Sequence, residues 1–108
     1  MKLLPSLKQK KRYVVFEIES SKKFSYSDLK SLIEIALKDF LGQLGLSKSS
    51  SMLVKEKFKD NKFIIKTNHT YVDECKAALI LIKKIKNESV IVKSLTVSGT
   101  LKKAAKSL

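Results

Sequence analysis

The chain has 108 residues, of which 23 are Lys or Arg and 10 are Asp or Glu, giving a formal net charge of +13. Its apolar fraction of 44% excludes disorder along the whole chain, and its length supports one hydrophobic core rather than two. A domain this basic attracts a polyanion, most often nucleic acid. Arg12 is the single arginine, so the sequence favours contacts with phosphates over the reading of bases.

Cysteine content and hydropathy indicate the compartment. A single cysteine, Cys75, excludes an internal disulfide and gives no sign of an oxidising environment. The longest apolar run, Ala77–Ile82, is too short to cross a bilayer, and a proline interrupts the apolar part of the N-terminus. The sequence therefore predicts a cytoplasmic protein without membrane contact.

The first predicted elements are a strand and a long helix. Residues 12–20 alternate in the manner of a strand, with Val14, Phe16 and Ile18 on one face and Tyr13, Val15, Glu17 and Glu19 on the other. Apolar residues then recur at helical spacing from Leu29 to Leu44. Ser25 and Asp28 fit a capping box, Gly42 and Gly45 fit C-terminal stops, and residues 47–51 are predicted to form a loop.

The second half of the chain repeats this alternation of elements. Residues 52–58 and 62–68 are predicted strands, joined by a turn at Asp60 and Asn61. Thr70 and Asp73 fit a second capping box, before a helical stripe that runs from residue 72 to residue 85. Residues 89–97 form the last predicted strand, which Gly99 ends, and the final eight residues are good helix formers.

The order β-α-β-β-α-β is that of an α+β, ferredoxin-like fold with a four-stranded antiparallel sheet. We expect a single domain over residues 1–108, with a basic arm over residues 1–11 and a tail or short helix over residues 99–108. Both long helices are expected to cover one face of the sheet. The other face is expected to be left open.

The expected open face carries apolar side chains but few aromatic ones. It lacks the aromatic-rich strand motif of RNA-recognition domains, so stacking of single-stranded RNA on the sheet is not expected. The apolar residues of this face suit a protein partner or the chain's own tail, although scattered exposed aliphatic residues are also common. The second helix is apolar around most of its circumference and suggests a further partner, either the tail or another subunit. The predicted protein-interface residues are Tyr13, Val15, Leu53, Ile64, Ile80 and Leu81.

The cations cluster in four places: the arm, the hairpin, the end of the second helix and the tail. Lys83, Lys84 and Lys86 also suit the dipole of the second helix, which explains them without a ligand. The arm and the tail have no such explanation, and rows of cations there are suited to neutralising phosphates. The predicted RNA-binding residues are Lys8, Lys10, Lys11, Arg12, Lys102, Lys103 and Lys106.

Groups for catalysis or metal binding are few. His69 precedes the second helix, where a capping or surface role fits, and Cys75 lies on an apolar stripe that predicts a buried thiol. Asp73 and Glu74 are adjacent on a helix and point in different directions, which disfavours chelation of one metal ion. The sequence predicts no catalytic residue and no metal site in this chain.

Five segments carry a resemblance to a known family: LPSLKQKKRYVVFEI, FSYSDLK, FLGQLGL, NHTYVDECKAAL and VSGTLKKA. Together they resemble the small ferredoxin-like subunit of archaeal ribonuclease P, protein component 2, which has a eukaryotic counterpart. The resemblance covers nearly the whole chain in order. The loop SKSSS and the hairpin KEKFKDNKF are unusually rich in Ser and Lys, so family contacts transfer least well to that region.

The resemblance implies a non-catalytic subunit of an RNA-based endonuclease that removes the 5′ leader from precursor tRNA. It implies that the RNA performs the chemistry with Mg²⁺ and that the protein binds no cofactor itself. The implied partners are the ribonuclease P RNA, precursor tRNA, a barrel-fold protein subunit and other protein subunits. Two pairs of small and barrel-fold subunits can join through the small subunits.

Two alternative functions remain open from the sequence. One is a generic basic RNA-binding or protein-interaction domain. The other is a stand-alone metal-dependent nuclease, which would need carboxylates such as Glu17, Glu19 and Asp73 to meet at a strand end.

Overall fold

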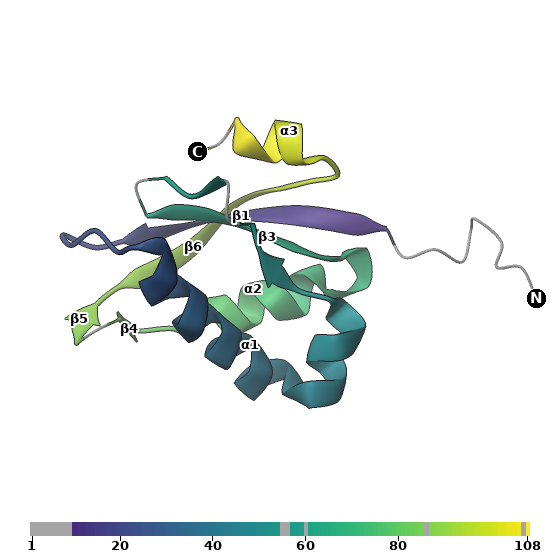
Figure 1. Cartoon of the computed structure of the whole chain (residues 1–108), viewed down its shortest axis with the longest axis horizontal. Helices are drawn as coiled ribbons and strands as arrows, with labels where there is room; N and C mark the ends of the chain where they lie inside the picture. The colour runs from purple at the N-terminus through teal and green to yellow at the C-terminus, as the bar shows by residue number, and fades with distance from the viewer. Residues whose placement is uncertain (1–9, 55–56, 60, 86, 107) are drawn as a thin grey trace, which may run out of the picture.

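A four-stranded sheet lies between two long helices on one side and a short helix on the other (Figure 1). The computed structural model describes residues 10–54, 57–59, 61–85, 87–106 and 108. The elements in chain order are β1 (Lys11–Glu19), α1 (Tyr26–Ser49), β2 (Met52–Leu53), β3 (Lys62–Asn68), the 3₁₀ turn η3 (His69–Tyr71), α2 (Val72–Ile80), β4 (Lys84–Ile85), β5 (Glu88–Ser89), β6 (Ile91–Ser98) and α3 (Leu101–Ala105).

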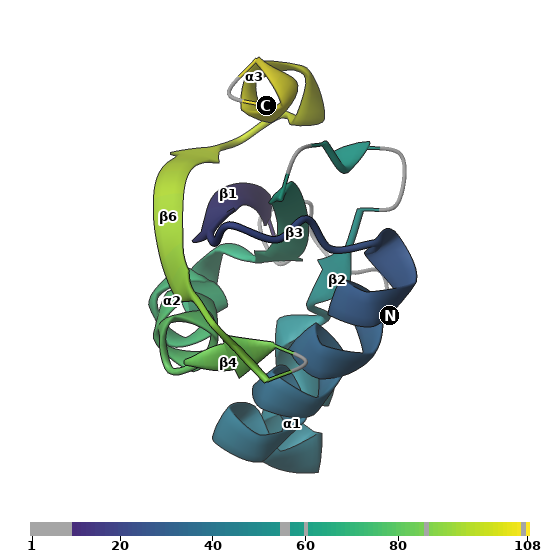
Figure 2. The same ribbon diagram turned by 90° about the vertical axis from the view of Figure 1, so that its left-hand side faces the viewer.

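The main sheet has the strand order β2-β3-β1-β6, and all its neighbouring strands are antiparallel. β1 lies in the middle, where it pairs with β3 from Lys11↔Asn68 to Glu17↔Lys62 and with β6 on its other side. Helices α1 and α2 lie together on one face (Figures 1 and 2). The predicted α+β, ferredoxin-like arrangement is confirmed.

The main core forms where the sheet meets α1 and α2, because alternate strand residues and one stripe of each helix point there. Val14, Phe16 and Ile18 of β1 enter this core, as the alternation predicts. The rings of Phe16 and Phe63 stack with their centroids 5.4 Å apart. The buried members are Val14, Phe16, Ile18, Phe24, Leu29, Ile33, Leu37, Phe63, Ile65, Cys75, Ala78, Leu79, Ile85, Val90 and Val92.

Helix α1 begins as predicted but ends later. The Ser25 side chain accepts a hydrogen bond from the Asp28 backbone, and the Asp28 side chain accepts one from Ser25, so the capping box is confirmed. Gly42 has a non-helical conformation, with a φ of 74° and a ψ of 172°, so the predicted stop there ends the first of two helical segments that meet at a kink. The helix continues to Ser49 and ends at Ser50, which is in the left-handed region. The predicted loop over residues 47–51 was therefore mostly wrong.

Helix α2 ends at Ile80, five residues before the predicted apolar stripe does. The chain after it forms a two-stranded hairpin in which β4 pairs with β5, and the sequence pattern did not predict this hairpin. The apolar stripe predicted too long a helix, because Ile82 and Ile85 pack on the main core although they lie outside the helix. Thr70 makes no capping contact, since Tyr71 is the N-cap of α2 and no side chain caps it, so the second capping box was wrong.

The strand predicted over residues 52–58 is much shorter in the structure. β2 contains only Met52 and Leu53, although the Val54 amide still donates to the Ile64 carbonyl. Of the two predicted turn residues, Asp60 lies outside the described residues. Asn61 is buried with a φ of 62°, and its side chain accepts from the Phe24 amide and donates to the Lys22 carbonyl. It therefore ties the turn to the segment before α1.

A smaller apolar cluster lies on the opposite face of the sheet, beneath α3. Val15 of β1, Ile64 of β3 and Ala104 of α3 are all fully buried there. The expectation that this face is left open was wrong, because the chain's own tail folds back over part of it (Figure 2). No described helix is long and apolar enough to span a bilayer.

Candidate nucleic-acid interface

The tail presents three of the predicted RNA-binding lysines on a folded element. The Thr100 side chain caps α3 by accepting from the Lys103 amide. With Ala104 buried against the sheet, Lys102, Lys103 and Lys106 are left exposed. No ion pair among the described residues engages these three lysines. Their charges are therefore directed at solvent, where a polyanion can reach them.

The start of β1 presents the cations of the other chain end. Lys10 is exposed just before the strand, and its carbonyl accepts from the His69 amide, which extends the pairing of β1 with β3. Lys11 is the first residue of β1 rather than part of a free arm, and its Nζ donates to the Asn68 side chain, 2.5 Å away. Lys8 lies outside the described residues.

Arg12 joins the two basic segments. Its guanidinium lies so close to Gly99 that a Cβ atom at Gly99 would be 3.7 Å from Arg12 Nη1. β6 runs beside β1 and ends at Ser98. Gly99 and the cap residue Thr100 then connect it to α3. Arg12 therefore lies close to the segment that leads into the tail lysines, although some ninety residues separate them in sequence.

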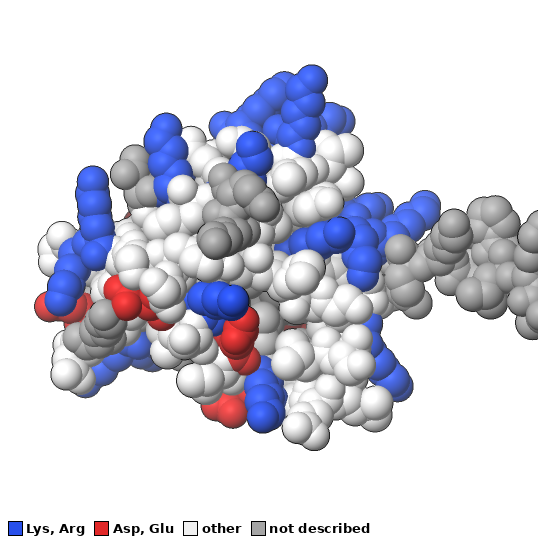
Figure 3. Space-filling model, in the orientation of Figure 1, with Lys and Arg blue, Asp and Glu red and all other residues white. Residues whose placement is uncertain are grey.

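The surface view agrees with this convergence. On the face drawn in Figure 3, Lys and Arg side chains lie over α3 and around the start of β1, and others are spread over the rest of that face, while the Asp and Glu side chains lie away from α3. Lys66 adds a cation that was not among the predicted RNA-binding residues. It is half-buried and pairs across the strands with Tyr13, two residues along β3 from Ile64. Strand alternation from Ile64 was the signal that could have found it.

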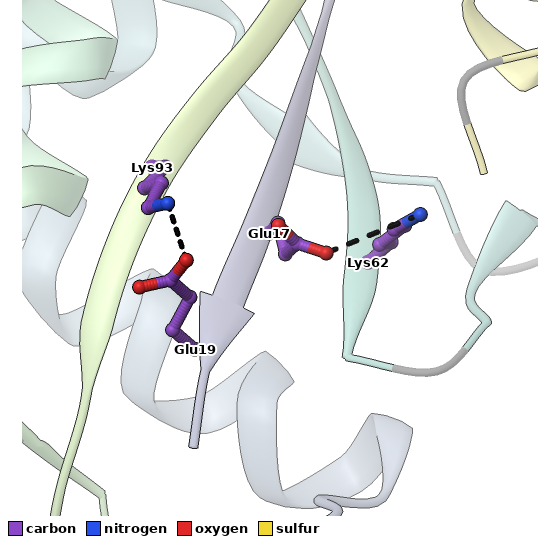
Figure 4. Close-up of polar contacts among 4 residues, drawn as sticks. All are labelled: Glu17, Glu19, Lys62 and Lys93. Atoms are coloured by element: carbon purple, nitrogen blue, oxygen red, sulfur yellow. Dashed lines mark ion pairs between the residues drawn. The ribbon is translucent and has the colours of Figure 1, made fainter.

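The carboxylates of β1 are neutralised by lysines of the neighbouring strands (Figure 4). Glu17 lies 4.0 Å from Lys62 Nζ on β3, and Glu19 forms an ion pair with Lys93 on β6. The Glu19 carboxylate raises the pKa of Lys93 by hydrogen bonding and by charge attraction. These two glutamates therefore repel an approaching RNA less than unpaired carboxylates would.

Three predicted protein-interface residues lie at α3. Val15 and Ile64 are fully buried by the chain's own tail, so they are not accessible to a partner while α3 is seated. Tyr13 is half-buried at the edge of the same cluster. Of the two occupants considered for this face, a protein partner or the tail, the structure shows the tail.

The other three interface predictions fall on the helix side of the sheet. Leu53 pairs with Ile65 and packs on the main core, so its placement on the α3 side was wrong. Ile80 and Leu81 at the end of α2 are 46% and 62% exposed, and α3 cannot cover them because it lies across the sheet. They remain candidates for contact with another chain.

Exposed apolar side chains that the sequence analysis did not select lie near Ile80 and Leu81. Phe40 and Leu44 stand exposed on either side of the Gly42 kink. A hollow of about 270 Å³ between α1 and α2 is lined by Ala36, Asp39, Phe40, Ala78, Leu81 and Ile82. The regular apolar stripe of α1 did not show that these residues are exposed. The kink decides which part of the stripe the sheet covers, and the apolar pattern did not reveal the kink.

The lysines expected at the end of α2 lie elsewhere. Lys83 and Lys84 are exposed after the helix and in β4, so the helix dipole does not account for them. The cations of the predicted hairpin include Lys55, Lys57 and Lys59. Lys57 and Lys59 lie between β2 and β3, while Lys55 and Lys86 fall outside the described residues.

The side chains that could act in catalysis or metal binding are buried or far apart. Cys75 is buried in the main core, and that burial raises the pKa of its thiol to about 12, as a packing role requires. His69 is exposed, with its ring Nδ1 3.3 Å from the Lys10 carbonyl oxygen. Among the described residues, no three His, Cys, Asp or Glu side chains gather where they could hold a metal ion.

The fold and this surface define a small, strongly basic α+β protein with exposed lysines on α3 and an arginine at the start of β1 beside Gly99. The model of the Rpp14/Pop5 family matches residues 12–108, and the chain therefore belongs to the Rpp14/Pop5 family.

Curated relatives agree over almost the full length. The chain is 35% identical to ribonuclease P protein component 2 of Pyrococcus abyssi over 104 residues, which cover 96% of this chain and 88% of that protein. It is 36% identical to the protein of the same name from Methanocaldococcus jannaschii over 102 residues, covering 94% and 75%.

A solved structure shares the fold. A chain in the cryo-EM structure of yeast ribonuclease MRP superposes with a TM-score of 0.68 at 16% identity, covering 86% of this chain and 76% of that one. At this identity the likeness supports the ferredoxin-like fold alone.

Proposed function

We propose that this chain is a non-catalytic protein subunit of ribonuclease P that supports the catalytic RNA in removing the 5′ leader from precursor tRNA. Relatives that cover nearly its whole length bear the name ribonuclease P protein component 2. The observation that carries the proposal is the set of exposed lysines on α3, with Arg12 beside Gly99 in the segment that leads into this helix. A basic surface of this kind screens the repulsion between phosphates of a folded RNA.

The proposed partners follow from the two kinds of exposed surface. The cations suit the ribonuclease P RNA and its precursor tRNA. The apolar residues around the α1–α2 hollow, including Phe40 and Leu81, suit the barrel-fold subunit, other protein subunits, or a second copy within a four-chain assembly. In this proposal Mg²⁺ serves the RNA, the protein holds no cofactor, and the assembly works in the cytoplasm.

A stand-alone nuclease is less well supported by the geometry. Glu17 and Glu19 lie at the end of β1 and are paired with lysines, whereas Asp73 follows β3 at the opposite end of the sheet. Six residues of strand, roughly 20 Å, separate Glu17 from Lys11, the residue that pairs with the end of β3. These carboxylates do not meet, so they could not share one metal ion.

Reconstitution tests the proposal. The full chain, the cognate RNA and the barrel-fold subunit are combined with precursor tRNA over a range of Mg²⁺ concentrations. We expect no cleavage by the protein alone and faster cleavage by the RNA when both proteins are present, most clearly at low Mg²⁺. An absence of stimulation at every Mg²⁺ concentration would contradict the proposal. So would cleavage by the isolated chain that Glu17→Ala or Glu19→Ala abolishes.

A further inference from the structure

Helix α3 covers the part of the sheet on which single-stranded RNA stacks in RNA-recognition domains. Val15 and Ile64 occupy the centres of the two middle strands, and both are fully buried beneath Ala104. Leu101 and Leu108 pack against the same cluster. A nucleobase could reach these positions only by displacing α3 (Figure 2).

Aromatic side chains that could replace this platform are scarce on the α3 side. Proteins that hold single strands stack successive bases on exposed aromatic rings. Among the described residues, Phe40 is the one aromatic side chain that stands out as exposed, and it belongs to α1 on the other side of the sheet. Tyr13 is half-buried against the α3 cluster, and Phe58 is half-buried where the segment after β2 meets Ala105 and Leu108.

What α3 offers in place of stacking is a set of cations. Lys102, Lys103 and Lys106 are exposed on its outer side, and Arg12 lies at its base beside Gly99. An A-form duplex keeps its bases stacked inside and presents rows of phosphates, which proteins recognise by shape and charge. Lysines act as flexible point charges, so they suit phosphates and do not read base edges in the bidentate manner of arginine.

We propose that the surface formed by α3 and the start of β1 binds the phosphate backbone of double-stranded RNA in preference to single-stranded RNA. This inference rests on the proposed function and deepens it, because it names the kind of RNA element that the chain supports. The cover of α3 over Val15 and Ile64 contributes to the preference, because it closes this face to nucleobases and puts lysines there instead.

The first experiment compares two RNA probes with the full-length chain. One is an RNA hairpin and the other an unstructured oligouridine with the same number of phosphates. Binding is measured by fluorescence anisotropy at salt concentrations from about 0.05 M to about 0.3 M. Affinity that depends on phosphate contacts falls steeply over this range. We expect the hairpin to bind on the order of tenfold more tightly at about 0.1 M salt. Equal binding, or tighter binding of the oligouridine, would overturn the proposal.

A matched pair of double variants tests the surface. Lys102→Gln with Lys103→Gln removes two charges from α3, and Lys30→Gln with Lys38→Gln removes two exposed charges from α1. We expect the α3 variant to lower the slope of log affinity against log salt by about 2 for the hairpin. The α1 variant should leave affinity for the hairpin within about twofold. Equal losses in the two variants would overturn the assignment to α3.

A second pair of variants tests the packing of α3 on the sheet separately from its charge. Ala104→Gln overfills the buried contact without changing the charge, whereas Ala105→Gln places the same side chain at a half-buried position. We expect Ala104→Gln to reduce the preference for the hairpin and Ala105→Gln to preserve it. An unchanged preference in Ala104→Gln, with hydrogen exchange showing that α3 is unseated, would overturn the proposal. An unchanged preference with α3 still seated would overturn the claim that Ala104 holds it.

Failure of this inference can be distinguished from failure of the proposed function. If the chain stimulates the cognate RNA yet binds both probes equally, the duplex preference is wrong and the subunit role stands. If the chain prefers the hairpin yet never stimulates cleavage, the subunit role is wrong.

Discussion

The two faces of the sheet are built from neighbouring residues of the same strands but differ in what they hold together. On the helix side, residues such as Phe16 and Ile65 join a core to which α1, α2 and four strands contribute. On the α3 side, the fully buried members of the cluster among the described residues are just Val15, Ile64 and Ala104. The first face holds the fold together, and the second holds one short helix in place.

This difference indicates how the chain separates stability from function. A small cluster contributes little to the free energy of unfolding, since burial stabilises by roughly 25 cal/mol for each Å² of apolar surface. It is nevertheless sufficient to fix the outward side of α3, on which Lys102 and Lys103 stand. We therefore expect changes beneath α3 to affect RNA binding more than unfolding, and changes in the main core to do the reverse.

The largest expected effect is the contrast between two adjacent isoleucines of β3. Ile64 and Ile65 are both fully buried but point to opposite faces of the sheet. Ile65→Ala should lower the free energy of unfolding by about 2–5 kcal/mol, because the main core cannot collapse around the cavity. Ile64→Ala should cost less, because α3 can shift into the space.

Urea denaturation of both variants at equal protein concentration measures this contrast. A larger loss in Ile64→Ala would show that the α3 side is the more important face for folding, which would reverse the comparison.

The second prediction concerns alkaline stability, which reports on the main core. Burial raises the pKa of Cys75 to about 12 from an ordinary value of 9.0. Between these two values the unfolded chain releases the thiol proton while the folded chain keeps it. Stability should therefore fall as pH rises above 9, by about 1.4 kcal/mol for each pH unit.

Because many lysines also titrate in this range, the test is the difference between the native chain and Cys75→Ala. The slope of the free energy of unfolding between pH 9 and pH 11 should be smaller in the variant. Parallel curves would show that the thiol ionises as readily in the folded protein as in the unfolded chain.

The smallest expected effect is at the cap of α3. Thr100→Ala removes the side chain that accepts from the Lys103 amide. Loss of such a cap costs about 1 kcal/mol. Because α3 is held by few contacts, we expect faster amide exchange at Lys103 and Ala104, while amides of β1 exchange as before. Equal acceleration in β1 and α3 would mean that the two open together.

Much of the fold could be predicted because the local signals and the tertiary structure agree. The alternation from Val14 to Ile18 assigns the faces of β1, and the pairing of Ser25 with Asp28 marks the start of α1. The apolar stripe of α1 also predicted the buried residues Leu29, Ile33 and Leu37.

The errors arose where tertiary contacts override local pattern. The helical stripe runs on to Ile85, but the chain leaves the helix at Ile80 and still buries Ile85 by forming a hairpin. Leu53 was assigned to the wrong face because a two-residue strand shows too little alternation to fix its register.

The candidate site was only partly predictable. The sequence selected the cations of both chain ends but could not show that Arg12 and Gly99 are neighbours, since this depends on the pairing of β1 with β6. The sequence suggested that either the tail or a protein partner covers Val15 and Ile64, and it could not distinguish between the two. Ala104, the buried contact of α3, carries no local signal, because alanine favours a helix whichever way its side chain faces.

Cleavage of precursor tRNA in the reconstituted enzyme tests the central claim most directly: the chain supports the RNA through the cations of α3. The native chain is compared with Lys102→Gln/Lys103→Gln and with Lys30→Gln/Lys38→Gln at low Mg²⁺. The account predicts a loss of stimulation on the order of tenfold or more for the α3 variant, which higher Mg²⁺ restores, and little loss for the α1 variant. Full stimulation by the α3 variant would contradict it.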